Sequence, residues 1–237
     1  MKNRTPILII VMLLVIFMNM AANACRPYDP TDDISAVDLP DMSIASQVAT
    51  VWLNPDWFRL RFLLTDAGWF RLGAEPGDDP LSRGDETPQV ETHLPGFWMM
   101  SGEVTNKEYG MCVEAGVCST PTIRETGPTT HFGNPDYDDH PVVGVDWFQA
   151  EGYCEWIMAR LPTEAEWEKS ARGTQALIFP WGNDDPTCDK ANGQIEGCEN
   201  AGDTMPVGSF PMGASPYGFY DMAGNVREWM MDWYSED

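Results

Sequence analysis

The clearest hydrophobic pattern in this chain lies between Asp146 and Arg160, where apolar residues recur every three or four positions. This spacing places them on one face of an α-helix and predicts that the face packs against a core. Asp146 suits the start of such a helix, because its side chain can accept hydrogen bonds from the first-turn amides. The predicted apolar face consists of Trp147, Ala150, Cys154 and Ile157.

Two more helices are indicated by the polar residues of their first turns. In a capping box the threonine oxygen accepts from a first-turn amide, and a glutamate three residues later accepts from the threonine amide. The two boxes are Thr105 with Glu108 and Thr163 with Glu166. The first helix is predicted to run towards Gly116, and the second to end at Gly173, a residue that readily adopts the left-handed stop.

The rest of the pattern predicts short strands joined by long loops. Apolar residues 51–64 are predicted to form a strand or a domain-edge segment, and residues 69–73 a strand that ends at a glycine. Acidic residues 77–91 and polar residues 121–141 are predicted to be loops. From residue 179 onward the chain is rich in Gly, Pro and Asn, and such a long irregular region needs staples or bound ions to remain ordered.

Composition indicates an exported globular protein. The chain has 237 residues, 43% of them hydrophobic, and ten Trp, which suits a packed core in one large domain or two small ones. Lys2 and Arg4 precede an apolar run over 7–20, and residues 22–24 (ANA) have the small-x-small pattern of a cleavage site. Residues 1–24 are therefore predicted to be a signal peptide.

Cleavage of the signal peptide would make the net charge of the chain more negative. Removal of residues 1–24 leaves 12 basic residues against 37 acidic ones, a formal charge of −25. A protein with that charge is repelled by phosphate backbones, so nucleic acid is not expected as a partner. The expected location is the periplasm or the cell envelope.

Cys25 directly follows the predicted cleavage site, as the lipid-bearing cysteine does in bacterial lipoproteins. The match to a lipobox is partial, because Ala22 stands where Leu is usual and Asn23 is unusual at the next position. Two alternatives stay open: lipid attachment at Cys25, and a plain secreted N-terminus or an uncleaved signal anchor. Residues 25–50 are predicted to be an acidic tether ahead of a domain over 51–237.

An oxidising compartment makes neighbouring cysteines candidate disulfides. The pairs close in sequence are Cys112 with Cys118 and Cys188 with Cys198. If both form and Cys25 is lipidated or free, Cys154 has no partner. Cys154 is then either a buried thiol on the apolar helix face or a cysteine whose partner is missing from this chain.

Eight short sequence elements stand in order between residues 66 and 234. They are WFRLG from Trp69, DETP from Asp85, EVTN from Glu103 with Tyr109, HPVVGVDWFQAEGYCEW from His140, RLPTEAEWEKSARG from Arg160, FPWG from Phe179, MPVGSF from Met205 and YGFYDMAGNVREWMMDWY from Tyr217. Together they resemble the formylglycine-generating, sulfatase-modifying-factor family. The resemblance implies an α+β, C-type-lectin-like fold with few helices, small twisted sheets and much irregular chain.

The resemblance also implies that loops of this fold bind calcium. One site falls on the side chains of Asp221 and Glu228, with the carbonyls of Gly224 and Val226 between them. Calcium is a hard cation that takes several oxygen ligands, which this turn can supply. The alternative is that Asp221 and Glu228 are solvated or cap a turn. The second implied site consists of Asn192, the Gly193 carbonyl and a side-chain oxygen near Glu199.

The family's chemistry is implied to lie elsewhere. Its oxidases convert a substrate cysteine to formylglycine with oxygen, using two copper-binding cysteines in a segment that follows the GNVREW-like motif. The sequence runs to Asp237, and none of its six cysteines aligns with that pair. The chain is therefore expected to be a C-terminally incomplete member that is inactive as given, with Cys154 lacking a C-terminal partner. The alternative is a naturally shortened domain.

Two classes of function follow, and whether the protein is an enzyme stays open. The first is a sulfatase-activating oxidase acting on a sulfatase or another exported protein or peptide. The second is a non-catalytic, lectin-like, calcium-stabilised binding module at the cell envelope. His93, His131 and His140 are predicted to lie in loops as structural or solvated residues. They do not form the histidine cluster that iron-dependent relatives of the ergothioneine pathway use.

Overall fold

The computed structural model describes residues 6–8, 20–21, 25–27, 61–75, 81–121, 131–193, 195, 198 and 202–234. In these residues it has three helices, α3 (Asn106–Glu114), α4 (Trp147–Trp156) and α5 (Glu164–Arg172). The strands are β1 (Pro6–Leu8), β2 (Met20–Ala21), β3 (Arg26–Pro27), β4 (Phe62–Thr65), β5 (Gly68–Leu72), β6 (Val90–Leu94), β7 (Phe97–Met100), β8 (Ala159–Arg160) and β9 (Arg227–Trp233). Single 3₁₀ turns cover Gly84–Glu86, Pro135–Tyr137 and Pro211–Gly213.

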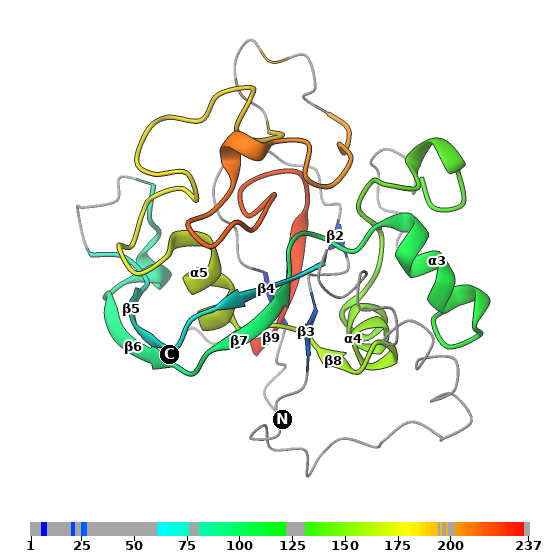
Figure 1. Ribbon diagram of the computed structural model, residues 1–237, viewed down its shortest axis with the longest axis horizontal. Helices are drawn as coiled ribbons and strands as arrows, with labels where there is room; N and C mark the ends of the chain where they lie inside the picture. Colours follow the sequence, from blue (N-terminus) through cyan, green and yellow to red (C-terminus); the bar gives the residue numbers. More distant parts are fainter. Residues whose placement is uncertain are drawn as a thin grey trace.

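The strands pair into several small sheets. β4 is antiparallel to β7, β5 to β6 and β3 to β8, while β9 lies between antiparallel β1 and parallel β2. In Figure 1, β9 runs through the middle of the molecule with α5 on one side and α4 on the other. The irregular chain between α5 and β9 forms the loops at the top of that view.

All three helices begin where the sequence predicts. Thr105 and Thr163 cap α3 and α5, and the glutamate three residues after each completes its capping box. Asp146 caps α4, and Gln149 completes a third box, which was not predicted. The predicted end of α5 at Gly173 is also confirmed, because this glycine has a φ of +65°.

The polar side of α5 is partly buried. Nζ of Lys169, a fully buried residue, donates to the carbonyls of Asp66 and Gly68 at 2.7 and 3.1 Å. Burial lowers the pKa of this amine. The two carbonyls satisfy the buried ammonium, so Lys169 fastens α5 to the connection between β4 and β5.

The predicted strand over 69–73 is confirmed as β5, but the loop predicted over 77–91 extends too far. β6 begins at Val90 and pairs with β5 along its whole length. The loop position predicted for His93 is wrong, because this residue lies in β6 opposite Trp69. Residues 51–60, 76–80 and 122–130 lie outside the described residues.

Helices α4 and α5 are tied to β9 by hydrogen bonds across the core. The indole nitrogen of Trp147 donates to the Met230 carbonyl at 2.8 Å. In the other direction, the Trp229 indole donates to the Val145 carbonyl at 3.1 Å, and the Met231 amide donates to the Pro162 carbonyl. These bonds hold β9, and the turn that precedes it, against the helical side of the domain.

All six cysteines, each of which the structure describes, are paired. The predicted disulfides Cys112–Cys118 and Cys188–Cys198 are both present. The prediction that Cys154 lacks a partner is wrong, because Cys154 is bonded to Cys25 across a sequence separation of 129 residues. A sulfur in a disulfide cannot also carry a lipid thioether, so the structure is at odds with lipidation of Cys25.

The first residues of the predicted tether belong to the core instead. Cys25 is completely buried, and its carbonyl accepts from the Met100 amide at 3.0 Å. Nε of Arg26, which is 3% exposed, lies 2.9 Å from Glu166 Oε1. Arg160 binds both oxygens of the same Glu166. The buried carboxylate of Glu166 therefore joins β3, β8 and α5, while residues 28–50 lie outside the described residues.

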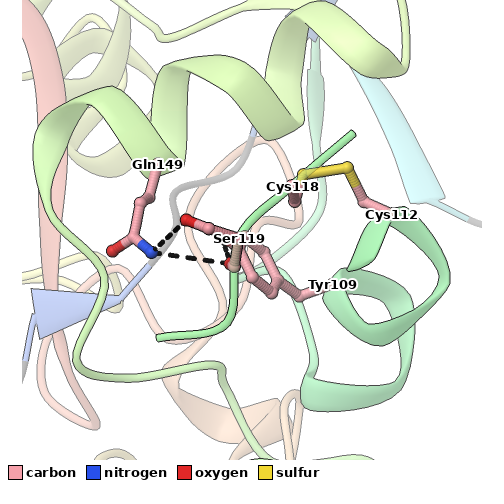
Figure 2. The surroundings of a disulfide bond; sticks show 5 residues. All are labelled: Tyr109, Cys112, Cys118, Ser119 and Gln149. Carbon is pink, nitrogen blue, oxygen red and sulfur yellow. Dashed lines mark hydrogen bonds between the residues drawn. A yellow bond between two sulfur atoms is a disulfide. The ribbon is translucent and has the colours of Figure 1, made fainter. Parts of the chain in front are cut away.

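The Gln149 side chain connects α4 to the residue that follows the Cys112–Cys118 disulfide (Figure 2). Gln149 Oε1 accepts from the Asp146 amide in the capping box, and Nε2 donates to Ser119 Oγ at 2.9 Å. The hydroxyl of Tyr109, which comes from α3, donates to the Ser119 carbonyl. The loop closed by Cys112–Cys118 is thus anchored to both helices.

The predicted signal segment 1–24 is described only at β1 and β2, whose backbones flank β9. Within the described ranges, no helix has the length and apolar character needed to cross a membrane.

Removal of the long-range disulfide should cost more stability than removal of a local one. A cross-link restricts the unfolded chain more when it closes a longer loop. We expect Cys25→Ser/Cys154→Ser to lower the free energy of unfolding by about 4–5 kcal/mol, against about 3 or less for Cys112→Ser/Cys118→Ser. Urea unfolding measures both, and a non-reducing peptide map of the wild type must contain the Cys25–Cys154 cross-link. Equal losses, or a free Cys154 thiol in the wild type, would contradict the assignment.

Candidate metal centre

Two buried carboxylates lie close in sequence, Asp221 in the turn that leads into β9 and Glu228 near the start of β9 itself. Asp221 is 8% exposed and Glu228 is 5% exposed, so neither is solvated. Asp221 and Asn225 both have a φ of +56°, a left-handed conformation that costs energy for residues other than glycine. Such a conformation persists only where neighbouring contacts hold it, which indicates a tightly determined turn.

Gly224 is required at its position by the backbone of another loop. Its φ is +102°, and a Cβ placed on it would collide with the carbonyl oxygen of Asn192. That same carbonyl accepts from the Asn225 amide at 2.8 Å. The turn therefore presses directly against the segment that holds the second predicted site.

Asn225 joins three irregular segments. Its Oδ1 accepts from Asn192 Nδ2 and from the Met205 amide, at 3.1 and 2.9 Å. Its Nδ2 donates to the Met205 carbonyl. These bonds satisfy the half-buried side-chain amide of Asn225. They also connect segments that have no backbone hydrogen bonds of a β-sheet between them.

Asp221 is fixed by one of its two oxygens. Oδ2 accepts from the Gly208 amide at 2.6 Å, which connects the turn to the MPVGSF segment. Burial raises the pKa of the Asp221 carboxyl, while the Gly208 hydrogen bond acts in the opposite direction.

A third carboxyl group, Glu103, faces this pair from the segment that precedes α3. Glu103 is fully buried, and its carboxyl group interacts with that of Asp221. Burial raises its pKa well above the usual value, and the charges of Asp221 and then Glu228 raise it further. In the sequence, Glu103 stands out only as part of the EVTN element. Its proximity to residues more than a hundred positions away is a tertiary effect.

The carboxyl groups of Asp221, Glu228 and Glu103 are of the chemical type that binds a hard cation. Three carboxyl groups in a dry environment repel unless they are protonated or paired with positive charge. Calcium takes six to eight oxygens at about 2.3–2.6 Å, commonly mixing carboxylates with backbone carbonyls. In the described part of the chain, no three His, Cys, Asp or Glu side chains are placed to hold a metal on their own. The carbonyls of Gly224 and Val226 would therefore have to supply part of the shell.

The second predicted site is only partly described. Asn192 is 7% exposed, and its Nδ2 donates to the Asp203 carbonyl at 2.8 Å as well as to Asn225. Gly193 follows it, but Glu199 lies outside the described residues. The structure brings Asn192 to the first site, where its carbonyl supports the turn.

Two histidines lie in a polar cluster next to this region. His131 Nε2 is 2.9 Å from Asp203 Oδ1, and the Tyr137 hydroxyl donates to Asp203 Oδ2 at 3.0 Å. His140 Nδ1 is 2.9 Å from Thr204 Oγ1, and burial lowers the His140 pKa. The predicted structural role of these residues suits the observed bonds, which hold the loop around 131–140 against the loop around 203.

Substitution of Gly224 should be more harmful than substitution of a glycine that also has a positive φ but lies in open space. Gly182 has a φ of +129°, and nothing lies within 4 Å of the position that a Cβ would take there. We expect Gly224→Ala to lose about 1–3 kcal/mol more unfolding free energy than Gly182→Ala, because only the former also forces the Asn192 backbone to move. Urea unfolding of both variants tests this. Similar losses would mean that the turn can move away from Asn192.

Comparison with known proteins adds independent information. Residues 60–237 match the family described as "Sulfatase-modifying factor enzyme 1-like domain". The chain is 43% identical over 217 residues to the formylglycine-generating enzyme of Bos taurus, covering 71% of this chain and 57% of that protein. It is 36% identical over 197 residues to the serine/threonine-protein kinase pkn1 of Chlamydia caviae, covering 78% of this chain and 30% of the kinase.

The chain thus spans about a third to somewhat over half of the length of these relatives. Among solved structures, PvdO from Pseudomonas aeruginosa has a TM-score of 0.62 and 30% identity, covering 74% of this chain and 71% of that one. The three short helices and small antiparallel sheets agree with the expected α+β, C-type-lectin-like fold. The match covers most of the chain, and the protein belongs to the sulfatase-modifying factor family.

Proposed function

We propose that this chain forms an exported, calcium-stabilised domain of the family, and that its own residues provide a scaffold and binding surface without carrying out cysteine oxidation. The observation that carries the proposal is the pairing of all six cysteines in three disulfides. Copper is bound by thiolates, and a cysteine in a disulfide has no thiolate to offer.

Burial supports the same assignment. Cys25, Cys112 and Cys154 are fully buried, and their disulfides fix secondary-structure elements to one another. Redox-active cysteines are accessible to their reaction partners, whereas these three are buried. They serve as structural cross-links.

Export is supported by the cross-links and by the predicted signal segment. Disulfides persist in oxidising compartments such as the periplasm and the cell surface. The proposed location is therefore the periplasm or the cell envelope. We do not extend the proposal to a lipid on Cys25, because its sulfur is bonded to Cys154.

A binding role is supported by aromatic side chains at the surface. Trp69 is 64% exposed beside His93 on the β5–β6 pair, and Trp98 and Trp233 are also exposed. Exposed tryptophans combine a large apolar area with a hydrogen-bond donor, which suits contact with an exported protein, a peptide or a glycan. The alternative that aromatic residues form the core holds for Trp156, Trp167 and Trp229, which are buried.

The second candidate function is that of a sulfatase-activating oxidase. It is favoured by the 43% identity to the formylglycine-generating enzyme of Bos taurus, whose name states that activity. In this case the copper-binding cysteines would come from sequence outside the 237 residues, and the present residues would position a sulfatase peptide.

The calcium proposal predicts a melting temperature that depends on the ion. A ligand present at a hundred times its dissociation constant stabilises the folded state by about 2.7 kcal/mol. We expect EDTA to lower the melting temperature of the disulfide-intact protein by about 5–10 °C relative to calcium-saturated protein. Magnesium, which demands a smaller octahedral shell, should restore less of the loss. An unchanged melting temperature would argue against a structural calcium ion.

The scaffold proposal predicts no oxidation by this chain alone. The protein is incubated with copper, oxygen and a cysteine-containing sulfatase peptide, and aldehyde is detected by hydrazide labelling and mass spectrometry. We expect no formylglycine, while the bovine enzyme run in parallel gives product. Aldehyde formed by this chain would overturn the scaffold assignment and favour the oxidase.

A further inference from the structure

We propose that the Cys188–Cys198 disulfide is a site of reversible thiol–disulfide exchange with dithiols, and that its reduction loosens the loop that supports the turn before β9. This inference goes beyond the proposed scaffold function, because it assigns a chemical reaction to one of the three cross-links. It does not depend on an ion at the turn.

This disulfide differs from the other two in its access to solvent. Cys188 is an exposed residue, whereas Cys25, Cys112 and Cys154 are completely buried and Cys118 is half-buried. A disulfide opens when a thiolate reaches one of its sulfur atoms, so access determines which pair reacts. A reagent can therefore attack at Cys188 while the protein remains folded.

The exchange consists of two substitutions at sulfur. A thiolate of the dithiol bonds to Cys188 Sγ, the disulfide bond breaks, and Cys198 Sγ leaves with the electron pair and takes a proton from water. The second thiolate of the reagent then attacks the reagent sulfur that is bonded to Cys188, and Cys188 Sγ leaves and is protonated in turn. In sum, the dithiol loses two electrons and two protons and becomes a disulfide, while the two cysteines gain both.

The charges around Cys188 select the kind of reagent. The adjacent Asp189 is exposed, as are Asp184 and Asp185 a few residues earlier, and Lys190 supplies one positive charge against these three. An excess of negative charge repels thiols that carry carboxylates, such as glutathione, more than it repels dithiols that have no other charge. The reagent class is therefore a dithiol without additional negative charge.

The residues enclosed by the disulfide support the turn before β9. Asn192, which is 7% exposed, lies between the two cysteines in the sequence. Its carbonyl accepts from the Asn225 amide at 2.8 Å and leaves no room for a Cβ on Gly224. Its Nδ2 donates to Asn225 Oδ1 and to the Asp203 carbonyl. The loop thus holds the turn from below through one residue.

Reduction changes how firmly this loop is held. A cross-link that closes a short loop restricts the conformations of the chain between its ends. The Lys190 carbonyl also lies where a Cβ on Gly213 would be, so the loop packs closely against a second segment near Cys188. When the disulfide opens, these contacts must hold the loop without the cross-link, and Asn192 separates from Asn225 more often without global unfolding.

Partial reduction of the folded protein tests the access of a reagent to this pair. The wild type is incubated with dithiothreitol in EDTA without denaturant, alkylated at intervals and mapped by mass spectrometry. We expect Cys188 and Cys198 to be labelled at least about tenfold faster than the other four cysteines. Labelling of all six at one rate, or earlier opening of Cys112–Cys118, would overturn the proposal.

The reagent class is tested with Asp189→Asn, which removes the charge next to the reacting sulfur. At low ionic strength this variant should be opened faster by glutathione, and the increase should exceed that for dithiothreitol, because glutathione carries more negative charge. Equal increases for the two reagents, or no increase for either, would contradict the assigned class.

The effect on the turn is measured in Cys188→Ser/Cys198→Ser, which lacks the cross-link permanently. We expect hydrogen exchange at the Asn225 amide, measured in EDTA, to become faster by on the order of tenfold. The Met231 amide, which donates to the Pro162 carbonyl, is the internal reference and should exchange as in the wild type. Should the double variant fail to fold, the wild type reduced with dithiothreitol takes its place.

Cys112→Ser/Cys118→Ser is the matched control, because it removes a short cross-link that does not enclose Asn192. In this control the exchange rate of the Asn225 amide relative to that of Met231 should stay as in the wild type. An unchanged Asn225 rate in Cys188→Ser/Cys198→Ser would mean that the disulfide does not control the turn. Equal acceleration at Asn225 and Met231 would indicate a global loss of stability and would also overturn the proposal. Because EDTA is present throughout, neither result depends on the proposed calcium ion.

Discussion

The structure depends on the buried carboxylate of Glu166, where β3 meets β8 and α5, which follow more than a hundred residues later in the chain. Its oxygens bind Arg26 of β3 and Arg160 of β8, and they accept from the Thr163 amide at the start of α5. A buried ion pair adds little net stability, because desolvation offsets most of the attraction. Loss of the carboxylate, however, would break both ion pairs at once, and breaking a buried pair costs about 3–5 kcal/mol. Glu166 therefore specifies how these elements are arranged more than it stabilises them.

In the irregular half of the domain, too, buried polar side chains connect segments, but here they are mainly amides. The described part of this half has no long pairs of hydrogen-bonded strands, so side chains must supply hydrogen bonds to many of its backbone groups. Asn225 does this for the loops around Asn192 and Met205, and the strained turn brings Asp221 and Glu228 into the interior. The Glu166 carboxylate is bound by two arginines, whereas at the turn Asp221 and Glu228 lie close enough to the buried carboxyl group of Glu103 to raise its pKa.

Local features of this fold could be predicted from sequence, because the chemistry that determines them is local. The caps at Thr105 and Thr163 and the stop at Gly173 each depend on residues within a few positions. Cys112–Cys118 and Cys188–Cys198 close short loops for the same reason. The resemblance identified the turn at Asp221 and Glu228. Glu103 was missed because it reaches that turn only through tertiary packing, and no periodicity or spacing in the chain encodes that distance.

Cys25 shows how two interpretations of one residue conflict physically. Its position after a small-x-small pattern suits a lipid-bearing N-terminus, while its complete burial and its bond to Cys154 suit a core cross-link. One sulfur cannot do both. A lipid on Cys25 would also have to leave the interior, which would break the hydrogen bond from Met100 and draw Arg26 away from Glu166. Glu166 would then keep Arg160 but lose its contact with β3, so anchoring by lipid would act against the packing of the domain it anchors.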